Sequence, residues 1–223
     1  MTKIEFQDWG QMDYKQAWEK QKEIFNRLVK QKGDKQSTGN YLIFVEHPHV
    51  YTLGKSGDKQ NLLITPEMLQ RIEATYYHVD RGGDITYHGF GQIVGYPIFD
   101  LEDLGLSYKD YIYKLENSII KYLKNRHSIE SFQLEKATGV WVETSTGVKK
   151  ICAIGTRASR YITMHGFALN VNTDLRYFGY INPCGFVDKG VISLEKIKGE
   201  KQDLESEKIF LHRFIIDEFE TNL

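Results

Sequence analysis

The residues between 139 and 155 constrain the fold most, because they have the pattern of a β-hairpin. Two strand-like stretches, 139–144 and 148–155, are separated by the short turn Ser145-Thr146-Gly147. A tight turn of this kind makes its two strands antiparallel neighbours in one sheet. The sequence therefore predicts a sheet that is antiparallel at least in the middle of the chain.

Other segments place helices around a central run of strands. Further strands are predicted at 41–45, 76–80, 161–163 and 167–171. Helices are predicted at 13–30, 107–124, 193–198 and 205–220, and a helix start at Thr65-Pro66-Glu67. The chain contains no repeat and no linker rich in Pro, Gly and Ser. We expect one catalytic domain, 1–223, of the mixed α/β class, with a largely antiparallel sheet flanked by helices.

Composition excludes several classes of protein. The 223 residues are 41% apolar and 26% charged, which is typical of a soluble globular protein. The net charge of −1 provides no bulk basic field for nucleic acid or an anionic membrane. No apolar run approaches the roughly 20 residues needed to cross a bilayer, and the N-terminus does not resemble a signal peptide. We expect a cytoplasmic monomer with free thiols.

Cys184 lies in Asn182-Pro183-Cys184-Gly185-Phe186, a segment unsuited to a strand or a helix. A core cysteine normally lies inside an apolar run, as Cys152 does, so Cys152 is predicted to be a core residue. A cysteine on a turn is a candidate nucleophile. The alternative is a loop cysteine without a chemical role.

A glycine-rich stretch from Arg81 to Gln92 is the second candidate site. Its four glycines permit close approach of the backbone to a ligand, and Arg81 and His88 could contact polar parts of a substrate. The stretch is neither a P-loop nor a dinucleotide fingerprint. A purely structural cluster of turns is the alternative.

Three further patterns leave their chemistry open. Strand alternation places Lys150, Cys152 and Ile154 on one face of strand 148–155, and Lys149 on the other. His165 and Asn170 flank a predicted compact turn and could activate Cys184 as in a papain-like thiol hydrolase. Glu46-His47-Pro48-His49 has no matching ligands elsewhere at metal spacing, so no metal is expected.

Taken together, these segments resemble the lipoyl(octanoyl) transferases of lipoate biosynthesis. The resemblance covers most of residues 40–200, and the order of its segments is specific although each alone is weak. The matching segments are Glu46-His47-Pro48, Tyr51-Thr52-Leu53-Gly54, Arg81-Gly82-Gly83, Thr86-Tyr87-His88-Gly89, Gly91-Gln92, Tyr96-Pro97-Ile98, Gly139-Val140-Trp141-Val142, Lys150-Ile151, Ile154-Gly155, His165-Gly166-Phe167-Ala168-Leu169-Asn170 and Pro183-Cys184-Gly185.

The resemblance implies specific roles. The family's acyl-thioester cysteine falls on Cys184. The lysine that opens the family's Lys-Ile-x-x-Ile-Gly strand falls on Lys150, in preference to Lys149. The family's substrate pocket falls on Arg81, Gly82, Gly83, Asp84, Ile85, Thr86, Tyr87, His88, Ala153, Ile154, Gly155, Gly166, Phe167 and Ala168. Phe90 stands where family members often have proline, which affects the local turn. The implied fold is the catalytic domain shared by biotin and lipoate protein ligases.

The implied reaction needs no cofactor. An octanoyl group would pass from octanoyl-acyl carrier protein to Cys184, and then to a lysine of a lipoyl domain. The implied acceptors are the lipoyl domains of 2-oxoacid dehydrogenase complexes and the glycine cleavage H protein. The alternatives are an ATP-dependent lipoate or biotin protein ligase of the same fold, and a non-catalytic module that binds lipoyl domains or the acyl carrier.

Overall fold

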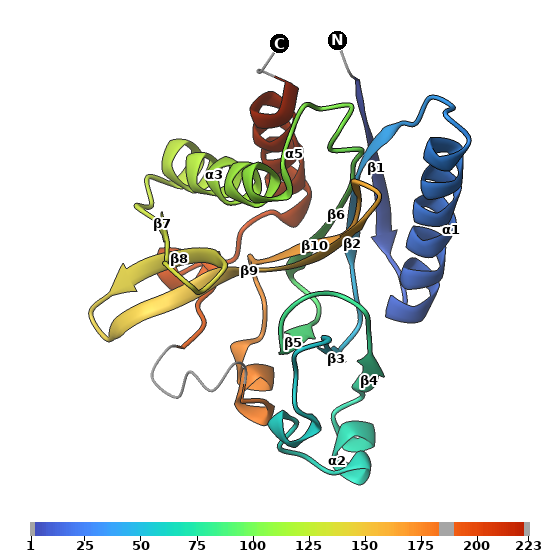
Figure 1. Cartoon of the computed structure of the whole chain (residues 1–223). Helices are drawn as coiled ribbons and strands as arrows, with labels where there is room; N and C mark the ends of the chain where they lie inside the picture. The colour runs from blue at the N-terminus through green and yellow to red at the C-terminus, as the bar shows by residue number, and fades with distance from the viewer. Residues whose placement is uncertain (1–2, 183–189, 221–223) are drawn as a thin grey trace.

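A seven-stranded sheet forms the centre of the molecule (Figure 1). The computed structural model describes residues 3–182 and 190–220. The strands of this sheet are β1 (Ile4–Gln11), β2 (Asn40–Glu46), β6 (Gln92–Ile98), β7 (Phe132–Gln133), β8 (Gly139–Thr144), β9 (Gly147–Ser159) and β10 (Ile162–Asn170). Their order is β1-β2-β6-β10-β9-β8-β7, and β1 and β2 are parallel whereas the other neighbouring pairs are antiparallel. The predicted fold class is confirmed.

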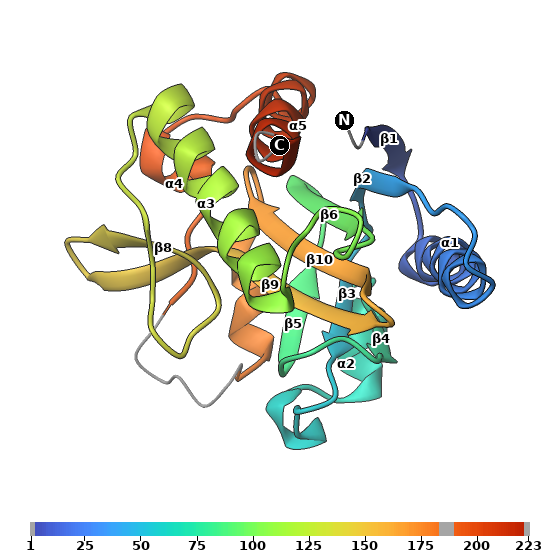
Figure 2. The ribbon, with the colours of Figure 1, turned by 45° about the horizontal axis from the view of Figure 1, so that its top comes forward.

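Helices cover both faces of this sheet. On one face, α3 (Tyr108–His127) packs against α5 (Leu204–Glu220), and the short α4 (Leu194–Lys198) lies near them (Figure 2). On the other face, α1 (Tyr14–Gly33) packs against β6 and β10. Side chains alternate along β2, so Leu42 and Phe44 join the α3–α5 core, whereas Ile43 and Val45 join the α1 core. Burial on both faces explains why β2 is a continuous apolar run.

A smaller sheet with strand order β4-β3-β5 lies beside the main one (Figure 1). It consists of β3 (Val50–Leu53), β4 (Thr75–His78) and β5 (Ile85–His88). The helix α2 (Pro66–Arg71) and the 3-10 turns η1 (Lys59–Asn61) and η2 (Leu175–Tyr180) accompany it, and Tyr51, Tyr87 and Ile181 belong to its core. In the described part of the chain, no helix is long and apolar enough to span a bilayer.

The predicted helix starts are confirmed, because local hydrogen bonds determine them. The Asp13 carboxylate accepts hydrogen bonds from the first backbone amides of α1. Ser107 and Asp110 form a reciprocal capping box at the start of α3. Thr65 caps α2, whose first residue is Pro66. These interactions lie within a few residues of one another in the sequence, so pattern alone can identify them.

The predicted compact turn between two strands at 161–163 and 167–171 is wrong. Residues 162–170 form the single strand β10, which pairs with β9 on one side and β6 on the other. The pairs His165–Thr156 and Gly166–Gly155 continue the ladder through the predicted turn. His165 has a left-handed φ of 61°, which produces a local irregularity without ending the strand.

Candidate functional site

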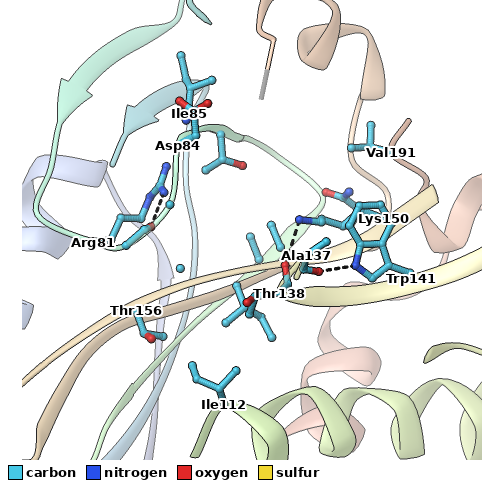
Figure 3. Close-up of a pocket in the computed structure, with 18 of the residues that line it drawn as sticks. Arg81, Asp84, Ile85, Ile112, Ala137, Thr138, Trp141, Lys150, Thr156 and Val191 are labelled. Atoms are coloured by element: carbon cyan, nitrogen blue, oxygen red, sulfur yellow. Dashed lines mark hydrogen bonds between the residues drawn. The ribbon is translucent and has the colours of Figure 1, made fainter. Parts of the chain in front are cut away.

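A cavity of about 380 Å³ lies at the edge of β9 (Figure 3). β8 pairs with β9 as far as Gly139 opposite Ala153, and the loop before β5 meets β9 where Gly82 N donates to Thr156 O at 2.9 Å. Between these two contacts, Ile154 and Gly155 line the cavity. The volume is within the range of small-molecule sites. The cavity therefore lies along the part of β9 that pairs neither with β8 nor with the loop before β5.

Most of the predicted pocket residues lie at this cavity or at a smaller one of about 50 Å³ that shares part of its lining. The larger cavity is lined by Arg81, Gly82, Gly83, Asp84, Ile85, Thr86, Ala153, Ile154, Gly155 and Ala168. The smaller cavity adds His88, Gly166 and Phe167. Tyr87 lines neither of the two, because alternation along β5 directs it into the small-sheet core, where its hydroxyl bonds His49 Nδ1 at 2.7 Å.

Lys150 lies at the opposite end of the larger cavity from Arg81 (Figure 3). Its Nζ donates to Thr138 O at 3.1 Å and lies 4.6 Å from the centre of the Trp141 ring. The Trp141 indole N–H in turn donates to Ala137 O at 2.8 Å. Gly139 gives the lysine room, because a Cβ there would be 3.2 Å from Lys150 Cε. The ammonium is thus held at the cavity by specific contacts.

The predicted placement of Lys150 and Cys152 on one face is wrong. Val140 of β8 pairs with Cys152, and the next residue of β8, Trp141, pairs with Lys150. Ile151 therefore has no pairing partner on β8 and is the extra residue of a β-bulge. Lys150 lines the cavity, whereas Cys152 is fully buried in the α3–α5 core. Burial raises the pKa of the Cys152 thiol well above its usual range. The prediction of Cys152 as a core residue is confirmed.

Cys184 lies outside the described residues, and the chain on both sides of its segment is anchored. Before the segment, Asn182 N donates to Asn61 O at 2.8 Å. After it, Lys150 N donates to Gly190 O at 3.0 Å, and Ile192 N donates to Lys150 O at 3.0 Å. The chain that follows Cys184 therefore pairs with β9 at Lys150 itself.

Arg81 holds the glycine-rich loop in place. Its Nη2 donates to Thr52 O at 2.6 Å, its Nε to Thr52 Oγ1 at 3.3 Å and its Nη1 to Gly82 O at 3.0 Å. The arginine is 7% exposed, so this cation is anchored by oxygens of β3 and of its own loop. Gly155 permits the close approach of the loop, since a Cβ there would lie 3.0 Å from Gly82 O. These contacts fix one wall of the cavity.

Three histidines near the smaller cavity are buried: His88 and His165 line it, and the His47 ring packs against that of His88. All three are neutral at physiological pH, mainly because burial lowers the pKa of His47 to about 4 and the pKa values of His88 and His165 to about 3. Arg81 lowers the pKa values of His88 and His165 further. His47 is bonded to Met12 O and the Tyr96 hydroxyl, and His88 to Gln92 Oε1. They act as satisfied polar groups of the core.

The alternative Cys–His–Asn arrangement includes Cys184, which lies outside the described residues, and its other two members, His165 and Asn170, have separate hydrogen-bond partners. The two residues are at opposite ends of the stretch 165–170 of β10. His165 Nε2 bonds Asp80 Oδ1 at 2.8 Å, whereas Asn170 donates to Ile192 O at 3.1 Å. Within residues 3–182 and 190–220, no group of three or more His, Cys, Asp or Glu side chains is placed to hold a metal ion.

Several residues at the cavity were not identified as site residues from sequence. Among them are Tyr108, Ile112, Thr138 and Trp141. The Trp141–Lys150 pair occupies opposite positions of the predicted hairpin, so exact hairpin register would have placed the indole beside the lysine. Tyr108 and Ile112 come from α3 across the sheet, and no local pattern indicates that contact.

The sequence matches a known protein family over most of its length. Residues 13–214 match the family described as Lipoyl protein ligase A/B catalytic domain. A protein of Bacteroides fragilis named Octanoyltransferase is 53% identical over 94% of this chain and 95% of its own length. A protein of the same name from Flavobacterium johnsoniae is 50% identical over 99% and 98% of the two chains.

A solved structure supports the fold. The bi-partite lipoate protein ligase of Thermoplasma acidophilum superposes with a TM-score of 0.74 at 10% identity, covering 99% of this chain and 85% of that chain. The predicted likeness to lipoate protein ligase catalytic domains is confirmed at the level of the fold.

Proposed function

Because this chain belongs to the Lipoyl protein ligase A/B catalytic domain family, we propose that it is an octanoyltransferase of protein lipoylation. In this proposal, octanoyl-acyl carrier protein is the donor and a lysine ε-amine of a lipoyl domain is the acceptor. The acceptors are the lipoyl domains of 2-oxoacid dehydrogenase complexes and the glycine cleavage H protein. The enzyme works as a cytoplasmic monomer of one catalytic domain and uses no cofactor.

One observation carries the proposal. The ammonium group of Lys150 lies at the end of a partly apolar cavity, and the Lys150 backbone pairs with Gly190, a residue shortly after Cys184 in the sequence. Gly190, which pairs with Lys150, follows Cys184 by six residues. A free thiol of pKa ~8.5 is only a few per cent ionised at neutral pH, so a neighbouring cation favours the reactive thiolate. This arrangement supports Cys184 as nucleophile and Lys150 as its partner.

In the first step the Cys184 thiolate attacks the carbonyl carbon of the octanoyl thioester. A bond forms between Cys184 Sγ and the acyl carbon, the bond to the carrier sulfur breaks, and the carrier leaves as a thiol after taking up a proton. One thioester replaces another, so this step is close to balanced in free energy. The ammonium form of Lys150 stabilises the attacking thiolate.

In the second step the acceptor amine attacks the acyl carbon of the octanoyl-enzyme. The carbon–sulfur bond breaks, an amide forms, and Cys184 regains a thiol. Lys150, as a neutral amine, removes a proton from the attacking ammonium or amine. An amide is more stable than a thioester, so this step drives the transfer forward.

The cavity suits an acyl chain. Apolar side chains from three different elements line it, namely Ile112 of α3, Trp141 of β8 and Ile154 of β9. Each buried methylene contributes roughly 0.8 kcal/mol to binding. The loop held by Arg81 closes the cavity at the end away from Lys150, so we expect the acyl tail to extend from the lysine towards that loop.

Intact-mass spectrometry tests the nucleophile. After incubation with octanoyl-acyl carrier protein, the wild-type protein and Cys152→Ala should each gain one octanoyl group, and Cys184→Ala should gain none. An adduct on Cys152, or an active Cys184→Ala variant, refutes the assignment. Transfer to a lipoyl domain should proceed without ATP, whereas an ATP-dependent ligase would require the nucleotide. A binding module would form complexes without any adduct.

A further inference from the structure

Glu116 is a buried carboxylate that the proposed mechanism does not use. It lies on α3, at 7% exposure, among apolar residues such as Leu115 and Ile119 that pack on the main sheet. Its Oε1 accepts a hydrogen bond from Gly139 N at 2.7 Å. An ionised group in such a position needs a compensating partner, because burial alone strongly disfavours its charge.

A single peptide group joins this carboxylate to Lys150. The peptide between Thr138 and Gly139 donates its N–H to Glu116, and its carbonyl oxygen accepts from Lys150 Nζ at 3.1 Å. The peptide dipole therefore has its positive end towards the carboxylate and its negative end towards the ammonium. Hydrogen bonds in such a chain polarise and strengthen one another.

The two charges lie at most about 8 Å apart, because two hydrogen bonds and one peptide group separate them. Burial raises the pKa of Glu116, while the Gly139 N–H and the charge of Lys150 oppose that rise. Among the described residues, charged or titratable groups near the lysine include Cys152 and Lys149 on β9, Lys136 before β8, and Arg81 and Asp84 across the cavity.

We propose that Glu116 is a positioning residue for Lys150: through the Thr138–Gly139 peptide it holds the lysine nitrogen at the cavity and favours its ammonium form. The role of Lys150 in acyl transfer rests on the proposed function, but its coupling to Glu116 does not. The carboxylate keeps the lysine charged while the thiolate of Cys184 attacks. In the second step Lys150 must be neutral to take a proton from the acceptor amine, so it gives up its own proton after the carrier has left and before the acceptor attacks.

Competitive acetylation with acetic anhydride tests the coupling without an activity assay. Only neutral amines react, so the labelling rate of Lys150, read by peptide mass spectrometry, reports its uncharged fraction, and Lys149 is an internal reference. Glu116→Gln keeps an acceptor oxygen and removes the charge. At a pH where Lys150 is mostly charged, its labelling should rise about 2- to 30-fold in this variant, the range for charges about 8 Å apart between aqueous and protein-surface screening.

Glu218→Gln is the matched control, because Glu218 also contacts α3, through Asn117 and Lys121, and does not line the cavity. It should leave Lys150 labelling at the wild-type rate. Equal labelling of Lys150 in wild-type protein and folded Glu116→Gln overturns the inference. If Glu116→Gln does not fold, Glu116→Asp replaces it: it keeps the charge and shortens the reach to Gly139, so the rates of Cys184 acylation and of acyl transfer should both fall. An unchanged transfer rate in Glu116→Asp refutes the positioning role.

These outcomes separate the two proposals. If wild-type protein forms no octanoyl adduct on Cys184 but Lys150 labelling responds to Glu116→Gln, the proposed function fails and the coupling holds. If the adduct forms and labelling does not respond, the coupling fails and the proposed function holds.

Discussion

Replacing Gly139 with alanine should damage both stability and the position of Lys150. Gly139 has a φ of +130°, in a region where side chains other than hydrogen are strained by about 1–3 kcal/mol. Its new Cβ would also lie 2.6 Å from Cys152 O and 3.2 Å from Lys150 Cε. Forced contacts of this kind typically cost a further ~1–3 kcal/mol.

Gly147→Ala separates these two effects. Gly147 lies at the start of β9 with a φ of +101°, and a Cβ there would have nothing within 4 Å. It therefore carries the conformational cost without the contacts. In thermal unfolding, Gly139→Ala should melt roughly 2–12 °C below Gly147→Ala, since 1 kcal/mol corresponds to about 2–4 °C in a chain of this size.

The activity assay uses transfer of octanoyl groups to a lipoyl domain. A displacement of Lys150 by about 1 Å should reduce transfer on the order of 100-fold in Gly139→Ala. Gly147→Ala should remain close to wild type, because nothing at the cavity moves. If the two variants have the same melting temperature and the same activity, then Gly139 does not give Lys150 its room, and the account of the site is wrong.

Three other predictions use the same assays. Lys150→Ala should depress transfer far more than Lys149→Ala, and equal losses would remove the assigned base. Cys152→Ser should lower the free energy of unfolding by about 1–3 kcal/mol, because it replaces a buried thiol of the α3–α5 core with a more polar hydroxyl. Mass spectrometry should still find the octanoyl adduct on Cys184 in this variant. Acidification should destabilise the fold in chemical denaturation series, because three histidines have folded pKa values near 3–4, below their ordinary 6.5, so the unfolded chain binds protons first. Stability should be complete above pH 6.5 and decrease by up to about 1.4 kcal/mol per pH unit for each histidine as the pH falls towards 4. The three histidines are His47, His88 and His165. A flat stability profile, or a profile that changes when the exposed His78 is substituted, would contradict this prediction.

The helices and the hairpin could be predicted because their signals are local. The side chains of Asp13, Thr65 and Ser107 each cap a helix by accepting hydrogen bonds from backbone amides two or three residues later in the sequence. The predicted hairpin corresponds to β8 and β9, although β9 continues to Ser159. Pairing with β10, which follows after a turn at residues 160–161, extends β9 beyond the part that pairs with β8. Local pattern gives an element its type, whereas its length depends on the neighbour that pairs with it.

β1 shows the same limit more strongly, because it was not predicted at all. Residues 4–11 mix apolar and polar side chains, and the strand is stabilised by parallel pairing with β2 across the intervening α1. No turn signal links the two strands. Parallel pairing requires a crossover of many residues, so the contact is invisible to short-range pattern.

The candidate site was only partly predictable for a related reason. Most of the pocket residues indicated by the family motifs do line the two cavities, and they lie in three short segments of the sequence. Strand alternation misplaced Lys150 because Ile151 forms a bulge, and a bulge depends on register with β8 rather than on the sequence of β9 alone. The bulge separates Lys150 from the core position of Cys152 and directs it towards the cavity.

The position of Lys150 therefore depends on three elements that are not adjacent in the sequence. β8 contributes Gly139 and Trp141, α3 contributes Glu116, and the chain after residue 189 pairs with Lys150 through Gly190 and Ile192. A substitution in any one of them can move the lysine without touching it directly. Double-substitution cycles between Gly139 and Lys150 should accordingly be non-additive.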